Sequence, residues 1–236
     1  MNQSTLLEKI TELKYTGLKE AYLRQVEDVS YHTMSFDERL YQLLDAQDIF
    51  LKDKQASLED IDYRAKRALN KAQVHSLAAL NFIRSHQNII ITGKTGTGKS
   101  YIAQAFANRA ILDGFRAYYI RTPSLLEEIR VARIDGTYTS LLKKYSRFQI
   151  LVLDDFGVSN IKDDDATNLF EIIEDRTELN STIITSQLPV SEWYEYLNNN
   201  TIADAILDRI VHSSHRIELQ GESMRKIKSQ VQKIEY

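Results

Sequence analysis

The feature that most constrains this 236-residue chain is the loop GKTGTGKS at residues 93–100, which follows the apolar run NIIIT at 88–92. Three of the eight glycines of the chain lie in this loop. The loop matches the pattern GxxxxGK[ST] completely, and this pattern is informative where a strand precedes it and a helix begins within it. A helical stretch at 100–112 provides that context. We therefore predict a strand–loop–helix unit that binds phosphate groups.

The chemistry of such a loop follows from its backbone. Glycines let successive N–H groups point inward at an anion, at a helix N-terminus whose dipole favours negative charge. Lys99 is expected to reach the β- and γ-phosphate oxygens, and the Ser100 hydroxyl to ligate Mg²⁺. The plain alternative, a glycine-rich turn with an incidental lysine, does not explain the complete match. We predict ATP and Mg²⁺ as cofactors, with nucleotide-binding residues Gly93, Lys94, Thr95, Gly96, Thr97, Gly98, Lys99, Ser100 and Tyr101.

Two carboxylates, Asp154 and Asp155, follow the apolar residues 150–153. Asp154 is the predicted Mg²⁺ ligand, through water, and Asp155 is expected on the other side of the strand end, as general base for the attacking water. Taken alone, Asp-Asp-Phe-Gly would be a turn after a strand. The phosphate loop upstream favours the functional interpretation.

The chain divides into two parts by pattern. Leucines at helical spacing predict an all-helical module over 1–70, in which Ser35 and Glu38 match a capping box. From about 75 to 220, short apolar runs alternate with helical stretches, which predicts an α/β domain with a parallel sheet covered on both faces. The expected strands are 88–92, 117–121, 148–153 and 182–186, and the expected helices include 100–112, 124–133 and 165–176.

Composition excludes some classes of protein. The chain has no Cys, so disulfides, thiolate zinc sites and cysteine nucleophiles are excluded. It has no apolar run of about 20 residues and no signal-peptide layout, so we expect an intracellular protein with no membrane partner. The net charge of −3 argues mildly against nucleic acid. However, residues 109–149 carry eight basic and four acidic side chains, whereas residues 153–178 carry nine acidic and two basic ones.

Four segments carry a family resemblance. GKTGTGKSYIAQAFANRA, LVLDDFG, TIITSQLPVSEWYEYL and AILDRIVHSSHRIELQGESMR resemble the IstB family of AAA+ ATPases, the helper proteins of insertion-sequence transposition and relatives of the helicase loader DnaC and the initiator DnaA. LLEKITELKYTGLKEAYLRQ and SFDERLYQLLDAQ are also similar, so the resemblance covers nearly the whole chain. It implies a P-loop AAA+ core over 71–236 and a helical domain over 1–70 that contacts DNA, partners or other subunits.

The resemblance also implies an ATP-dependent homo-oligomer on duplex DNA that assists a DDE-type transposase in the bacterial cytoplasm, in association with the nucleoid. Arg209 matches the arginine finger, which reaches the ATP of a neighbouring subunit. Arg176 is a second candidate for that role. The plain alternative is that Arg209 pairs with Asp204 or Asp208 on its own helix.

Two further sets of residues follow from the resemblance. Ser186 matches the polar sensor position at the end of the strand 182–186, although the neighbours Thr185 and Gln187 leave its register open. A basic helical insertion at about 124–147, broken near Gly136, is expected to contact DNA phosphates without sequence preference. A solvated helix face is the alternative. The predicted DNA-binding residues are Arg130, Arg133, Lys143 and Lys144.

Two departures from most AAA+ proteins matter. The strand 150–153 leads into Asp-Asp rather than Asp-Glu, and the shorter Asp155 predicts slow hydrolysis. The chain stops soon after Gly221, so no C-terminal lid domain is expected. Three alternatives stay open: a DnaC-like helicase loader on single-stranded DNA, a small-molecule P-loop kinase, and a nucleotide-gated adaptor that does not hydrolyse ATP.

Overall fold

The structure is a computed structural model that describes residues 3–13, 15–52, 56–161, 163–224 and 226. It divides into two compact units, Met1–Gln55 and Ala56–Tyr236. The first unit contains α1 (Gln3–Glu12), α2 (Thr16–Glu27), the 3₁₀ helix η1 (Val29–Thr33) and α3 (Phe36–Lys52). The predicted capping box is confirmed at the start of α3: the N–H of Ser35 donates to Glu38 at 3.0 Å, and the N–H of Glu38 donates to the Ser35 hydroxyl at 3.2 Å.

Residues 56–70 are part of the second unit, although the sequence pattern groups them with the N-terminal helices. Three apolar side chains of this segment, Ala56, Leu58 and Ile61, are buried in the same core cluster as the sheet. Six of the fifteen residues in this segment are charged and the segment has no helical periodicity, so its few anchoring residues are not visible as a pattern. This segment reaches the phosphate loop, as described below.

The second unit is built on a five-stranded sheet of order β2-β3-β4-β1-β5, with every neighbouring pair parallel. The strands are β1 (Asn88–Gly93), β2 (Ala117–Arg121), β3 (Ile150–Phe156), β4 (Ser181–Ser186) and β5 (Ser214–Leu219). This arrangement confirms the predicted α/β fold. Because β1 lies between β4 and β5, the loop that follows β1 starts between the ends of two other strands.

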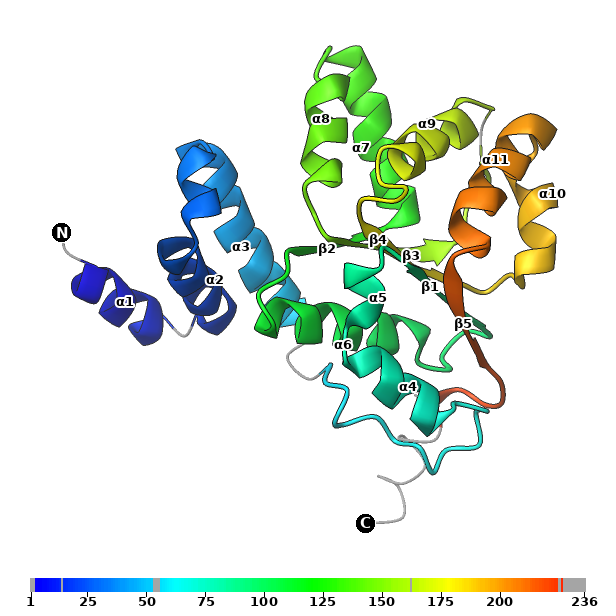
Figure 1. Ribbon diagram of the computed structural model, residues 1–236, viewed down its shortest axis with the longest axis horizontal. Coiled ribbons are helices and arrows are strands. Elements are labelled where there is room, and N and C mark those ends of the chain that lie inside the picture. Colours follow the sequence, from blue (N-terminus) through cyan, green and yellow to red (C-terminus); the bar gives the residue numbers. More distant parts are fainter. Residues whose placement is uncertain (1–2, 14, 53–55, 162, 225, 227–236) are drawn as a thin grey trace. The chain divides into compact units, whose positions relative to one another are not determined.

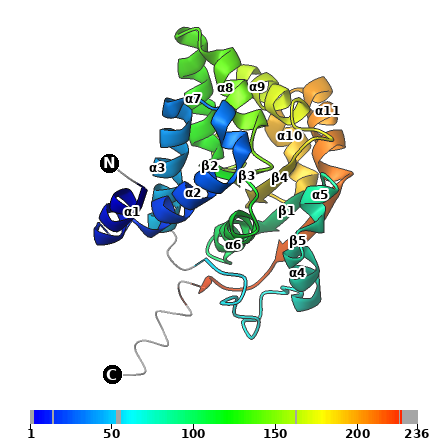
Figure 2. The same cartoon turned by 60° about the vertical axis from the view of Figure 1, so that its left-hand side comes forward.

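Helices cover both faces of this sheet (Figures 1 and 2). Ile89 and Ile91 of β1 pack toward one set of helices, and Ile90 between them packs toward the other set. Burial of alternate residues on both faces explains why the strand is apolar throughout. One face carries α4 (Lys71–Ala78), α5 (Asn81–Arg84) and α6 (Lys99–Leu112). The other face carries α7 (Thr122–Ile134), α8 (Tyr138–Ser146), α9 (Asp163–Glu174), α10 (Trp193–Leu197) and α11 (Asn200–Val211). The 3₁₀ helix η2 (Val190–Glu192) directly precedes α10.

Helix α7 begins at Thr122, two residues before the predicted start. Pro123 lies in its first turn, where the missing N–H of proline leaves no hydrogen bond unmade. Ser124 therefore lies inside the first turn of the helix rather than before it, and Glu127 pairs with Arg130 at 2.9 Å. The predicted break after this helix is confirmed, since α7 ends at Ile134 and α8 begins at Tyr138.

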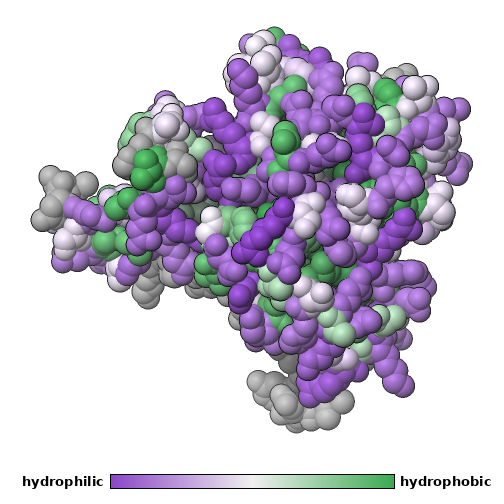
Figure 3. Space-filling view, in the orientation of Figure 1, coloured by the Kyte–Doolittle hydropathy of each residue, from purple (hydrophilic) through white to green (hydrophobic). Residues whose placement is uncertain are grey.

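Polar residues dominate the face of the molecule drawn in Figure 3, and apolar residues form small separate groups between them. In the described part of the chain, no helix combines the length and the apolar character that a bilayer crossing requires.

Candidate nucleotide-binding site

The loop between β1 and α6 has the backbone geometry that its glycines predict. Gly96 and Gly98 have φ angles of +83° and +97°, in the left-handed region that other residues rarely adopt. Gly98 is the N-cap of α6, and Lys99 is the first residue of the helix. The N-terminus of a 14-residue helix therefore opens into the loop, which is the geometry that favours a bound anion.

Lys99 is largely buried beneath the loop, and its ammonium donates to the carbonyl of Lys94 at 3.0 Å. Burial lowers the pKa of Lys99, while the nearby carboxylates of Asp154 and Asp155 act in the opposite direction. A buried ammonium at this place is a cation positioned for phosphate oxygens. The Tyr101 hydroxyl contacts the backbone of Ser57, so only the backbone of Tyr101, in the first turn of α6, remains a candidate for contact with a nucleotide.

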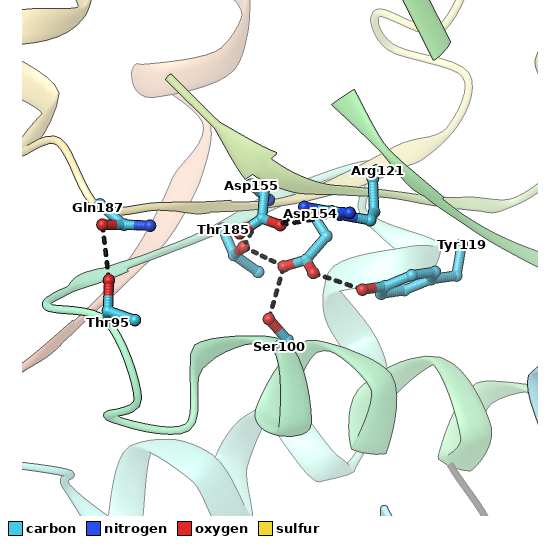
Figure 4. A network of polar contacts seen from close by, with 8 residues as sticks. All are labelled: Thr95, Ser100, Tyr119, Arg121, Asp154, Asp155, Thr185 and Gln187. Carbon is cyan, nitrogen blue, oxygen red and sulfur yellow. Dashed lines mark hydrogen bonds and ion pairs between the residues drawn. The ribbon is translucent and has the colours of Figure 1, made fainter. Parts of the chain in front are cut away.

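Asp154 lies at the centre of a hydrogen-bond network beside Ser100, in the first turn of the helix that follows the loop (Figure 4). The Ser100 hydroxyl donates to its Oδ1 at 2.9 Å, and the Thr185 hydroxyl donates to the same oxygen. The Tyr119 hydroxyl donates to Oδ2. Burial, followed by the charge of Asp154, raises the pKa of Tyr119, so this phenol keeps its proton and acts as a donor. The structure thus brings the two predicted metal ligands, Ser100 and Asp154, into direct contact.

Asp155 lies beside Asp154, whereas simple alternation along the strand predicts it on the other side. The pairing of β3 with β4 shifts register between Leu153 and Phe156, where β3 contains one extra residue, and Asp155 has a φ of +57°. Its carboxylate pairs with Arg121 at the end of β2, at 2.9 Å from Nε and 2.8 Å from Nη2. Figure 4 shows the two neighbouring carboxylates with different partners.

The end of β4 brings Thr185 and Gln187 to the site but not Ser186. The Thr185 hydroxyl contacts Asp154, and Gln187 accepts a hydrogen bond from the Thr95 hydroxyl at 2.7 Å. The Ser186 hydroxyl instead donates to the carbonyl of Phe156 at 2.7 Å. Since successive side chains of a strand point to opposite faces, the sensor role predicted for Ser186 fits Thr185 or Gln187 better.

Arg209 lies near the amino end of β1, whereas the loop follows the carboxyl end of that strand. Its carbonyl accepts a hydrogen bond from Asn88, the first residue of β1. The Arg209 guanidinium pairs with Glu174 of α9 and donates to the carbonyl of Ala205 at 3.0 Å. It therefore pairs with neither of the acids considered from sequence, and in this subunit it is too far from the loop to reach it.

Arg176 has a structural role, which corrects its prediction as a residue that reaches a neighbouring subunit. It is 1% exposed, and its guanidinium donates to the carbonyls of Tyr145, Phe148 and Ser181 at 2.6, 2.8 and 2.5 Å. Burial lowers the pKa of Arg176 to about 9, so it remains charged at neutral pH. A side chain held in this way is not available to another subunit.

Two of the predicted DNA-binding residues hold α7 against α9. Arg130 pairs with Asp165 at 2.7 Å, and the carboxylate of Asp165 is 1% exposed. Arg133 donates to Asn168 at 2.8 Å and lies over the ring of Tyr138, 3.8 Å from its centroid. These side chains stabilise the fold, and their charges are partly used within the molecule.

The other two predicted DNA-binding residues lie on α8 and differ in exposure. Lys144 pairs with Glu128 at 3.5 Å and lies over the rings of Tyr118 and Tyr145. Lys143 is exposed, and the described part of the chain contains no ion-pair partner for it. Of the four residues, Lys143 is the one whose charge is fully directed to solvent.

Sequence reasoning missed Tyr119, Arg121 and Arg67. Tyr119 and Arg121 share one face of the strand 117–121, a spacing that the sequence displays. Their role depends on β2 lying next to β3, with Arg121 opposite Asp154, and strand order is not encoded in local spacing. Arg67 comes from the charged segment before α4, where no pattern distinguishes a buried arginine from an exposed one.

A groove adjoins the start of the loop. This groove of about 420 Å³ lies at the carboxyl ends of β1, β4 and β5 and is lined by residues that include Gly93, Lys94, Gln187 and Gly221. In the described residues, no cluster of three or more His, Cys, Asp or Glu side chains is present to hold a metal by protein ligands alone. One buried carboxylate with one hydroxyl is instead the donor set of a Mg²⁺ ion that is completed by water and phosphate.

Comparison with known proteins gives a consistent result. The family model described as IstB-like ATP binding protein matches residues 8–232. An insertion sequence ATP-binding protein of Sinorhizobium fredii is 38% identical over 233 residues, with 93% of this chain and 95% of that protein covered. The ATP-binding protein of insertion sequence IS1162 from Pseudomonas fluorescens is 37% identical, with 81% of this chain and 88% of that protein covered.

Solved structures agree in fold. A replication initiator DnaA bound to AMPPCP and single-stranded DNA matches with a TM-score of 0.60 and 21% identity, over 78% of this chain and 56% of that chain. A crystal structure of DnaI matches with a TM-score of 0.61 and 22% identity, over 74% of this chain and 94% of that chain. The chain thus spans little more than half of the DnaA chain, with which it shares the fold of the sheet unit. With the phosphate loop, the Ser100–Asp154 contact and a family match over most of its length, the chain belongs to the IstB-like family of ATP-binding proteins.

Proposed function

We propose that this protein is a Mg²⁺-dependent ATPase that assembles on duplex DNA and assists a transposase in target selection during insertion-sequence transposition. The observation that carries the ATPase proposal is the contact of Ser100 with Asp154 at 2.9 Å, in the first turn of a helix whose N-terminus is open to an anion. Insertion-sequence proteins at up to 38% identity support the transposition role.

Each residue of the site has a distinct task in this proposal. Lys99 and the loop N–H groups bind the phosphates, and Ser100 with Asp154 holds Mg²⁺, which supplies positive charge to the phosphate oxygens. Asp155 accepts a proton from the attacking water as general base. Thr185 orients Asp154 by donating to it, and it also accepts the N–H of Asp155 at 3.2 Å.

The position of Arg209 supports an assembly in which subunits complete one another's sites. The six-residue strand β1 separates Arg209 from the loop of its own subunit. A strand rises about 3.3 Å per residue, so the length of β1 keeps the two apart. Arg209 can therefore approach a γ-phosphate only from a neighbouring subunit, where its guanidinium would stabilise the charge that develops during hydrolysis. In that case it leaves Glu174, which is 47% exposed and readily solvated.

Duplex DNA, other copies of this chain and a transposase are the proposed partners, in the bacterial cytoplasm and in association with the nucleoid. Lys143 is the first candidate for a phosphate contact, because its charge is exposed and not engaged by a carboxylate in the described residues. The N-terminal helical unit is proposed to contribute contacts to DNA, to the transposase or to other subunits.

Electron microscopy of the purified protein with duplex DNA tests this function, with ATP compared with ADP and with samples that lack DNA. We expect ordered assemblies only when DNA and ATP are both present. The matched control is Lys99→Ala, which removes the phosphate-binding ammonium and should abolish assembly. A monomer under all these conditions would contradict both the oligomer and the role of Arg209.

A further inference from the structure

We propose that Arg67 is a positioning residue for the phosphate-binding loop: its guanidinium holds the carbonyl side of the loop, so that the N–H side remains directed at the nucleotide. This inference rests on the ATP site proposed above and adds to it a residue from the segment before α4.

Arg67 is only 4% exposed, which is rare for an arginine. Its Nη1 donates to the carbonyl of Thr97, in the loop, at 3.1 Å, and its Nη2 donates to the carbonyl of Asp62 at 3.0 Å. Burial lowers the pKa of Arg67, so the protein keeps this charge at an energetic cost. Both of these acceptors are backbone carbonyls, so the contacts of the guanidinium fix the path of the chain.

A second segment holds the loop beside Arg67. The N–H of Met224 donates to the carbonyl of Gly96 at 2.8 Å, and the N–H of Gln220 donates to the carbonyl of Arg67 at 3.0 Å. Residues 220–224, which follow β5, therefore contact both the loop and the segment that contains Arg67. Two segments that are about 150 residues apart in sequence thus meet at the outside of the loop.

The glycines of the loop match these close contacts. A Cβ at Gly98 would lie 2.7 Å from Nη1 of Arg67, and a Cβ at Gly96 would clash with the side chain of Ser223. Glycine is therefore required at position 98 for two reasons: the left-handed φ angle and the guanidinium that lies beside it. The close approach of Arg67 to the loop thus depends on the absence of a side chain at Gly98.

The function of this arrangement follows from the polarity of the peptide group. A loop whose N–H groups point inward at an anion turns carbonyls outward, and buried carbonyls need donors. The carbonyl of Lys94 accepts from the Thr97 hydroxyl at 2.8 Å, within the loop. The carbonyls of Gly96 and Thr97 are paired from outside, by Met224 and Arg67. Without Arg67, the Thr97 peptide is free to rotate, and the loop loses part of its preorganisation for phosphate.

The test compares three variants of the full chain by titration with a fluorescent ATP analogue and by steady-state ATPase kinetics with DNA. Arg67→Met keeps the apolar stem and removes both hydrogen bonds, and we expect ATP binding at least about tenfold weaker. KM rises correspondingly and kcat stays within about twofold, because the lost interaction serves binding. Arg67→Lys, which retains the charge and one donor group, should recover part of the affinity. Arg64→Met is the matched control, since that side chain is 94% exposed.

A merely structural role of Arg67 predicts a different result. The Tm of Arg67→Met would fall, but the increase in Tm on addition of ATP would equal that of the wild type, and this outcome overturns the proposal. If Arg67→Met does not fold, Arg67→Lys is the variant that tests the proposal. An ATP affinity of Arg67→Lys equal to that of the wild type would then contradict it. A wild-type chain that binds no ATP overturns both proposals, whereas wild-type binding together with unchanged binding by Arg67→Met overturns only this one.

Discussion

At the residue scale, one buried carboxylate organises the site. Asp154 accepts hydroxyl hydrogen bonds from Ser100 on α6, Tyr119 on β2 and Thr185 on β4. Hydroxyls are neutral donors, so they orient the carboxylate and leave its negative charge available to a metal ion. Asp155, one residue later, pairs with Arg121. Neighbouring acids therefore have separate environments, which is how two carboxylates in one site acquire different roles.

Replacement of Asp155 tests its role as general base. We expect Asp155→Asn to lower kcat by about a hundredfold or more, because general-base catalysis contributes about 10²- to 10⁴-fold. ATP affinity, measured by titration with a fluorescent analogue, should change little. Arg121→Gln is the control, since it removes the ion pair and keeps the base. Unchanged turnover in Asp155→Asn would exclude Asp155 as the general base, whereas a wild type that binds ATP without turnover would favour an adaptor that does not hydrolyse it.

A mixing experiment tests whether Arg209 acts across a subunit boundary. Arg209→Ala and Asp155→Asn should each lose DNA-stimulated ATPase activity, the first at its neighbour's site and the second at its own, while both still bind ATP. In an equimolar mixture, about a quarter of the sites combine an intact Asp155 with an intact Arg209 from the next subunit, so activity should partly return. Glu174→Gln, which releases Arg209, should retain activity. A mixture as inactive as its components would count against action between subunits.

At the element scale, the α7–α8 pair connects the site to its surroundings. Arg121 is the N-cap of α7, so the helix starts at the residue that pairs with Asp155. Contacts of Arg130 and Arg133 hold the other end of α7 against α9. Helix α7 is therefore anchored at both ends, by the Arg121–Asp155 pair at its start and by Arg130 and Arg133 toward its end.

Substitutions of Arg130 and Lys143 should distinguish the contribution of these helices to stability from their contribution to DNA binding. Arg130→Ala is expected to lower the free energy of unfolding by about 1–3 kcal/mol, because the buried carboxylate of Asp165 loses its cation. Lys143→Ala should leave stability unchanged and weaken DNA binding, with the salt slope reduced by about one. Chemical denaturation and fluorescence anisotropy measure the two effects. The reverse pattern would exclude Lys143 as a phosphate contact.

At the scale of the whole molecule, charge is segregated rather than balanced. The net charge of −3 combines an excess of four positive charges over residues 109–149 with an excess of seven negative charges over residues 153–178. In the structure, several of these charges meet as ion pairs between α7 and α9. Net charge is therefore a poor guide to nucleic-acid binding, because only exposed cations that are not engaged within the protein contribute to it.

Competition between duplex and single-stranded DNA tests the function of the whole assembly. With ATP present, we expect preferential binding to duplex, and an affinity that decreases steeply as the salt concentration rises, because phosphate contacts release counterions. Anisotropy with labelled oligonucleotides of equal length measures both. A preference for single strands would instead favour a helicase-loader role.

The sequence by itself determined the phosphate loop, the predicted strands, the capping box at Ser35 and the two acids at the end of β3. These features depend on local spacing, because backbone conformation and periodic burial act over a few residues. Tertiary structure alone decided that Tyr119 meets Asp154, that a bulge places Asp155 beside it, that Arg176 is buried, and that Arg67 holds the loop. These outcomes depend on strand order and on contacts between distant segments. An exposed arginine and a buried one therefore look alike in sequence, because their difference lies in what packs against them.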